Sequence, residues 1–72
     1  MKLTQRQKEI LQMLIDYINE NGFSPSYREL CDIADVNSPA TIWTHLKNLK
    51  NKGYIDYIPA KSRTIKILKG VE

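Results

Sequence analysis

Hydroxyl, amide and ammonium side chains recur at helical spacing between residues 38 and 52. On a wheel of about 100° per residue, Leu46 and Leu49 lie within about 40° of Ile42, so these three residues are expected to face a core. The opposite side then carries four residues: Ala40, Thr44, Lys47 and Asn51. Such side chains hydrogen-bond to base edges and phosphates, and no carboxylate is present there to repel a phosphate. The spacing therefore predicts a helix face that contacts the major groove of double-stranded DNA.

Thr41 and Trp43 flank this face. Trp43 has two compatible interpretations, because an indole at the edge of an apolar stripe can pack over a neighbouring element or contact thymine methyl groups and the sugar backbone. An exposed tryptophan can also anchor a partner protein. A protein-interaction module that uses Trp43 in this way is therefore the alternative to DNA binding.

Catalytic and metal-binding chemistry finds few candidate residues. The chain has one histidine, His45, one cysteine, Cys31, and no carboxylates paired on a common face. We therefore expect no enzymatic activity, no metal and no cofactor. His45 is expected to donate a hydrogen bond to the backbone or to a phosphate, and Cys31 to fill the core as a small apolar residue.

The charges are unevenly distributed along the 72 residues. Eleven basic and eight acidic residues give a net charge of +3, and the basic excess lies in the second half of the chain. From Lys47 onward, the only acidic residues are Asp56 and Glu72. This asymmetry favours a polyanionic partner such as nucleic acid.

Cysteine usage and hydropathy indicate the compartment. A single cysteine excludes an internal disulfide and indicates a reducing environment. The N-terminus is charged from the start, and no run approaches the roughly 18 apolar residues of a membrane span. We expect a cytoplasmic protein with no membrane partner.

A first helix is predicted from Thr4 to Asn21. Thr4 and Gln7 have the spacing of a capping box, in which each side chain bonds to a backbone amide at the helix start. Gly22 supplies a left-handed stop. One apolar stripe runs between them: Ile10, Leu11, Leu14, Ile15 and Ile18.

A second helix is predicted from Ser26 to about Ala34. Residues 23–26 form an extended link that could pair as a short strand, since the residue before Pro25 is pushed out of the helical region. Ser26 and Glu29 make a second capping box, and three residues are expected to line the core side: Leu30, Ile33 and Ala34. The amides at this start, with Ser26, Tyr27 and Arg28 around them, could hold a DNA phosphate, although a plain helix cap explains them equally well.

A third helix is predicted over residues 39–52, after a turn at residues 35–37. Ser38 stands at the N-cap, and Pro39 takes the first helical position, where a missing amide costs nothing. Gly53 ends the helix. Two helices joined by a tight turn are typical of a helix-turn-helix.

A β-hairpin is predicted after the third helix. The segments YIDYI and RTIKIL are rich in β-branched and aromatic residues, and PAKS joins them. The hairpin tip, residues 59–63, would form the wing of a winged helix-turn-helix. Its Lys61, Ser62 and Arg63 could reach phosphates or the adjacent minor groove, with Arg63 as the first choice, or form a plain solvated loop.

These elements define a mainly α fold with a small β-hairpin, a three-helix winged helix-turn-helix. We assign residues 1–69 to one DNA-binding domain. Residues 70–72 form a C-terminal stub that could begin a linker to a domain outside this sequence.

Three segments together resemble the N-terminal DNA-binding domain of the LexA repressors: LTQRQKEIL, SYRELCDIADVNSPATIWTHLKNLKNKGYI and SRTIKIL. The resemblance covers residues 3–68. The positions that carry it are Leu3, Thr4, Arg6, Gln7, Pro25, Ser38, His45, Leu46, Lys47, Lys52, Gly53 and Ile55. One departure is Asp35, at a turn position where the family often has glycine.

The resemblance implies base contacts from the start of the third helix: Ser38, Ala40, Thr41, Trp43 and Thr44. It implies phosphate contacts from the end of that helix, from the second helix and from the wing. The residues at the end of the third helix are Lys47, Asn51 and Lys52, and those of the second helix and the wing are the ones named in the paragraphs on these elements. It further implies a bacterial or phage nucleoid-associated repressor of the DNA-damage (SOS) response. Such proteins bind palindromic operators as homodimers, are weakly dimeric or monomeric in isolation, and carry a self-cleaving Ser-Lys peptidase domain, which this sequence does not reach.

Overall fold

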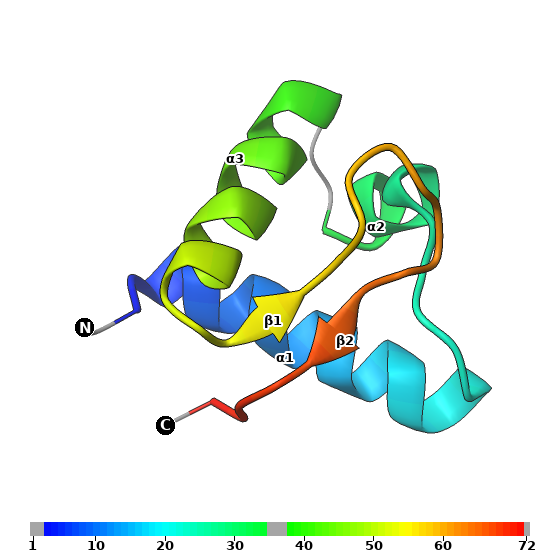
Figure 1. The fold of residues 1–72 in the computed structure, drawn as a ribbon, viewed down its shortest axis with the longest axis horizontal. Helices are drawn as coiled ribbons and strands as arrows, with labels where there is room; N and C mark the ends of the chain where they lie inside the picture. The colour runs from blue at the N-terminus through cyan, green and yellow to red at the C-terminus, as the bar shows by residue number, and fades with distance from the viewer. Residues whose placement is uncertain (1–2, 35–37, 72) are drawn as a thin grey trace.

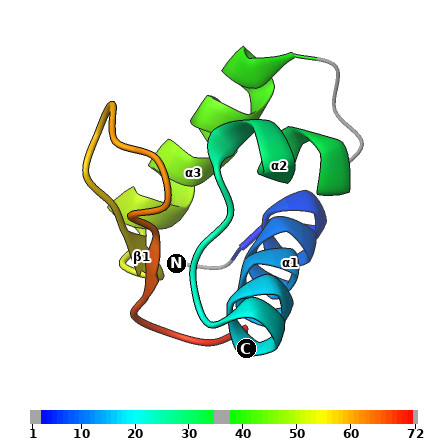
Figure 2. The same cartoon turned by 90° about the vertical axis from the view of Figure 1, so that its right-hand side faces the viewer.

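The computed structural model describes residues 3–34 and 38–71. In these residues three helices precede an antiparallel hairpin: α1 (Gln5–Asn21), α2 (Tyr27–Ile33), α3 (Pro39–Asn51), β1 (Ile55–Asp56) and β2 (Lys66–Ile67). The helices α2 and α3 lie across α1, and the hairpin lies beside the C-terminal end of α3 (Figures 1 and 2). The predicted winged helix-turn-helix is confirmed. The turn at residues 35–37, which includes Asp35, and Glu72 of the stub lie outside the described residues.

Every element contributes to one core. Ile42, Leu46 and Leu49 of α3 are fully buried, as the helical wheel predicted. They pack with apolar residues of the other elements: Ile10, Leu11, Leu14, Leu30, Tyr54, Ile55 and Ile65. Cys31 is partly buried against this cluster, consistent with its expected role. Only one side of α3 therefore packs against the core.

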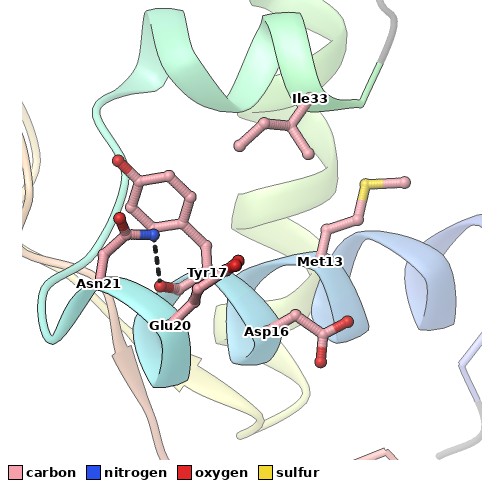
Figure 3. A pocket seen from close by; sticks show the side chains of 6 residues that line it. All are labelled: Met13, Asp16, Tyr17, Glu20, Asn21 and Ile33. Carbon is pink, nitrogen blue, oxygen red and sulfur yellow. Dashed lines mark hydrogen bonds between the residues drawn. The ribbon is translucent and has the colours of Figure 1, made fainter.

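The expected burial of Ile33 is wrong. Its side chain remains 43% exposed. Ile33 is the last residue of α2 and lines the rim of a surface groove between α1 and α2 (Figure 3). Because this rim is open to solvent, the last turn of α2 buries Ala34 but not Ile33.

Both predicted capping boxes are present. The Gln7 amide donates to Thr4 Oγ1 at 3.2 Å, and the Thr4 amide donates to Gln7 Oε1 at 3.0 Å. At α2, the Glu29 amide donates to Ser26 Oγ at 3.1 Å, and the Ser26 amide donates to Glu29 Oε1 at 2.9 Å. These local hydrogen bonds explain why the helix starts were predictable from four residues each.

The helix α3 begins and ends as predicted, to within one residue. Ser38 occupies the N-cap, but its hydroxyl forms no capping hydrogen bond, and Pro39 follows at the first position. At the other end Gly53 has a φ of +83°. The Gly53 amide donates to the Lys50 carbonyl and the Tyr54 amide to the Leu49 carbonyl, both at 3.0 Å, which is a Schellman stop.

The hairpin is confirmed, but its strands have only two residues each, with Ile55 opposite Ile67. The ladder stops because the next amides bond to side chains: Tyr57 donates to Asp56 Oδ1 at 2.9 Å and Ile58 to Thr64 Oγ1 at 3.0 Å. The loop between the strands is consequently longer than PAKS. Residues 24–26 are extended but belong to no strand, so the third strand considered for this link is absent from the described residues.

Candidate nucleic-acid interface

One side of α3 is open to solvent along its length. Five predicted contact residues on or next to this side are exposed: Ala40, Thr41, Thr44, Lys47 and Asn51. The N-cap residue Ser38 is exposed beside them. No acidic residue occurs in α3, and Lys47 takes part in none of the ion pairs between described residues. The structure therefore brings together a polar, cationic surface that a duplex could approach.

The Thr44 hydroxyl has a defined orientation on this surface. Its Oγ1 donates to the Ala40 carbonyl one turn earlier, at 3.0 Å. Because this bond uses the hydroxyl proton, the oxygen is left to accept a hydrogen bond from a ligand. The methyl group lies beside it. Thr44 is thus suited to accept a hydrogen bond from a base amino group or to touch a thymine methyl group.

Trp43 is half-buried between two other elements. Its ring lies 4.6 Å from the Tyr27 ring of α2 and 6.1 Å from the Tyr57 ring next to β1, measured between centroids. The packing interpretation of Trp43 is therefore correct. An indole that anchors a partner protein would have to leave this stack, which weighs against the protein-interaction alternative.

The wing loop reaches toward the start of α2 (Figure 1). The Tyr27 hydroxyl donates to the Lys61 carbonyl at 3.2 Å, and burial together with nearby Tyr57 raises the pKa of Tyr27, which favours the protonated donor. Lys61 and Ser62 are exposed at the tip. The guanidinium of Arg63 is instead paired with Glu29 at 2.8 Å. Two of the three predicted wing residues thus face solvent without such a pairing.

A surface groove lies between α1 and α2. Figure 3 shows Asp16 and Glu20 on its α1 side, with Met13 and Ile33 forming an apolar part. The expectation that no carboxylates share a face is therefore wrong for Asp16 and Glu20. Two carboxylates would repel phosphates. This groove is accordingly less suited to a phosphate backbone than the acid-free face of α3.

Comparisons with known proteins identify the family of this fold. The family described as the LexA DNA binding domain matches residues 1–64. The chain belongs to the LexA DNA-binding domain family. It is 39% identical over 66 residues to a LexA repressor of Carboxydothermus hydrogenoformans, covering 92% of this chain and 32% of that protein. It is 42% identical over 66 residues to a transcription regulator LexA of Synechocystis sp., with the same coverage.

A LexA repressor of Desulfatibacillum aliphaticivorans is 42% identical over 67 residues, covering 93% of this chain and 33% of that protein. The chain spans about a third of the length of these relatives. The LexA resemblance of the sequence is confirmed, and the module is one that binds double-stranded DNA. Within the described residues, no helix combines the length and apolarity needed to cross a membrane.

The capping groups at the start of α2 are already bonded within this LexA-type domain. Both capping amides, of Ser26 and Glu29, are already bonded within the box. The backbone hydrogen bond from Ser26, and then the Arg63 guanidinium, lower the pKa of Glu29 below its ordinary value of 4.5 and outweigh the opposing effect of burial. The structure therefore favours the plain helix cap here, and exposed Arg28 is the side chain of this segment best placed to meet a phosphate.

The end of α3 differs from the expectation drawn from the LexA pattern. Lys52 Nζ donates to Gln7 Oε1 of α1 at 2.9 Å. Lys50 Nζ donates to the Tyr57 carbonyl at 3.2 Å and lies 3.6 Å from Asp56. These lysines bind other elements of the domain, so Lys47 and Asn51 remain the better-placed groups for phosphates.

His45 is half-buried in α3. Its Nδ1 is buried and has no hydrogen-bond partner within the described residues. This nitrogen therefore does not form the predicted hydrogen bond to the backbone, and a bond from His45 to a phosphate stays a prediction.

Sequence reasoning missed Glu29 and Tyr17, whose side chains organise the wing from α2 and α1. Glu29 was noticed only as a capping residue, because its partner Arg63 is remote in sequence.

Proposed function

We propose that this chain recognises a specific DNA sequence and acts as the operator-binding part of a transcriptional repressor. The observation that carries the proposal is the acid-free face of α3, exposed at Thr44 and Lys47 while Ile42, Leu46 and Leu49 on the opposite side are fully buried. An α-helix with such a face fits the major groove of B-DNA. The names of the relatives, LexA repressor and transcription regulator LexA, support the regulatory role.

The contacts divide by position on α3. The N-terminal half approaches base edges with four exposed residues: Ser38, Ala40, Thr41 and Thr44. Half-buried Trp43 lies beside them and supports this face through its stack on Tyr27. Lys47 and Asn51 lie farther along the helix and approach the sugar-phosphate backbone. Such a division is common in helix-turn-helix proteins, where the start of the recognition helix contacts bases and other groups fix its register.

The remaining contacts surround this helix. Arg28 at the start of α2 and Lys61 and Ser62 of the wing are exposed cationic or hydroxyl groups for phosphates. Ser26, Tyr27 and Lys52 bond within the domain and contribute chiefly by holding these groups in place.

Two copies bind one operator in this proposal. A helix-turn-helix dimer places its recognition helices one helical turn of DNA apart, so its target is an inverted repeat. The copies associate on the DNA and only weakly without it. Control of DNA-damage genes by a cytoplasmic, nucleoid-associated repressor stays a prediction of the LexA resemblance, as does a further domain after residue 69.

Selection from randomised duplexes tests the proposal. We expect an inverted repeat to be recovered, with half-sites one helical turn apart. The affinity for the recovered duplex should depend steeply on salt: about four phosphate contacts per copy correspond to a log-log slope near −3.6 per copy. A pool without a shared motif, or a flat salt response, would refute sequence-specific binding.

A further inference from the structure

Arg63 is the wing residue most firmly bonded to the rest of the domain. Its backbone is left-handed, with a φ of 59°. Its guanidinium contacts three residues of the link and of α2: Glu29 Oε1 at 2.8 Å, the Ser24 carbonyl at 3.3 Å and the Phe23 ring at 5.0 Å from its centroid. A planar guanidinium can satisfy a carboxylate, a carbonyl and an aromatic ring at once, which an ammonium group does less well.

Glu29 connects this arginine to two helices. Its Oε1 also accepts from the Ser26 amide at 2.9 Å, which closes the capping box of α2. Its Oε2 accepts from the Tyr17 hydroxyl of α1 at 3.3 Å. One carboxylate thus ties the wing to the starting turn of α2 and to α1.

A second tether holds the same loop. Tyr27 donates to the Lys61 carbonyl and stacks on Trp43 of α3. Thr64 Oγ1 crosses the base of the loop, donating to and accepting from Ile58. The loop joins two strands of only two residues each, so these side-chain bonds, rather than a β-ladder, set its position.

We propose that Arg63 is a positioning residue, which with Glu29 and Ser24 fixes the wing against α2 so that Lys61 and Ser62 meet the DNA while Arg63 itself contacts no phosphate. The inference rests on the proposed function, because it requires the wing to lie in the DNA interface. It replaces the direct DNA contact that the sequence suggested for Arg63.

Charge explains why Arg63 stays with Glu29. A guanidinium that turns toward a phosphate leaves the Glu29 carboxylate unneutralised beside the same duplex, where it repels the backbone. The Arg63–Glu29 pair carries no net charge, so it releases no counterion from the DNA. A wing that is already ordered also loses less conformational entropy on binding.

Three single variants, together with the double variant Arg63→Asn/Glu29→Gln, separate positioning from phosphate contact. Arg63→Asn removes the guanidinium, and asparagine tolerates the left-handed backbone. Glu29→Gln removes the ion pair but keeps a capping side chain, since glutamine also closes a capping box. Lys61→Ala removes an exposed cation and is the matched control. Affinity for the selected duplex is measured across salt concentrations, and NMR order parameters of the amides of residues 60–62 are measured in the protein without DNA.

We expect the double variant Arg63→Asn/Glu29→Gln, which leaves no unneutralised carboxylate beside the duplex, to weaken binding about threefold to tenfold at every salt concentration, with an unchanged salt slope. Lys61→Ala should reduce the slope by about 0.9, the value for one lost phosphate contact. Both Arg63→Asn and Glu29→Gln should lower the order parameters of the wing amides, and Lys61→Ala should not.

A slope reduction for the double variant Arg63→Asn/Glu29→Gln equal to that for Lys61→Ala would overturn the inference, as would wing amides that stay ordered in both Arg63→Asn and Glu29→Gln. If Lys61→Ala changes neither affinity nor slope, the wing lies outside the DNA interface, and the inference fails while recognition by α3 stands. If the unsubstituted protein selects no duplex, the proposed function fails, and the inference fails with it.

Discussion

Replacement of Gly53 by alanine tests how the recognition helix is joined to the wing. Gly53 has a φ of +83° and follows the C-cap of α3. The Tyr54 amide beyond it returns to the Leu49 carbonyl, and the Tyr54 carbonyl accepts from the amides of Leu68 and Lys69 at 2.9 and 3.1 Å. The left-handed residue therefore sets the direction in which the chain leaves α3 and enters the hairpin.

The expected cost comes from the backbone alone. A Cβ built on Gly53 meets no heavy atom within 4 Å, so alanine causes no steric clash. The left-handed conformation costs an L-residue about 1–2 kcal/mol. Alanine also lowers the conformational entropy of the unfolded chain, which stabilises the folded domain by about 0.4–1 kcal/mol. The net loss in the free energy of unfolding is about 1 kcal/mol, which corresponds to a drop of about 4–8 °C in Tm for a domain of this size.

Thermal and urea unfolding measure this loss, and two further variants control it. Gly70→Ala is the matched control: its added Cβ also meets nothing within 4 Å, and Gly70 is not among the residues with positive φ, so its Tm should equal or slightly exceed that of the unsubstituted protein. Gly53→Asn should lose less than Gly53→Ala, because asparagine enters the left-handed region more readily. Equal Tm values for Gly53→Ala and Gly70→Ala would show that the left-handed conformation at residue 53 adds no cost for alanine.

The remaining predictions concern the DNA-facing surface and its supports. Lys47→Ala should weaken binding to many sequences alike and reduce the salt slope by about 0.9, as measured by titrations at several salt concentrations. Thr44→Ala should change the preference at one base position by about 1–3 kcal/mol, and selection experiments that return an unaltered motif would contradict a base contact. Trp43→Ala should destabilise the fold by about 2 kcal/mol through the lost contacts with two tyrosine rings, whereas Trp43→Phe should retain much of that stability in urea unfolding. The lowered pKa of Glu29 means that its contribution to stability is fully present above pH 4.5 and is lost as the pH falls through the folded-state pKa, so the Tm difference between Glu29→Gln and the unsubstituted protein should shrink on acidification.

The helices could be predicted because their signals are local. Each capping box involves residues three apart, and the apolar stripe of α3 repeats within a few turns. The same locality explains the correct placement of Gly53, since a helix stop depends on the φ of one residue. Ile33 was misplaced because its burial depends on a neighbouring helix and not on its own periodicity.

The strand lengths were also beyond local patterns. The β-rich composition of the last segments indicated a hairpin, but Asp56 and Thr64 side chains take the amides that a longer ladder would use. Competition of this kind between side chain and backbone depends on how the loop folds back on itself.

The sequence by itself determined three helices, a hairpin and an acid-free face on α3, because spacing, capping and helix stops act over a few neighbouring residues. Only the tertiary structure decided which cations bond to other parts of the domain. Arg63, Lys52 and Lys47 were all predicted to contact DNA. The fold brings Glu29 to Arg63 and Gln7 to Lys52. An ionic or hydrogen-bonding partner acts through distance in space, so its effect on a charged side chain emerges only once remote segments have packed together.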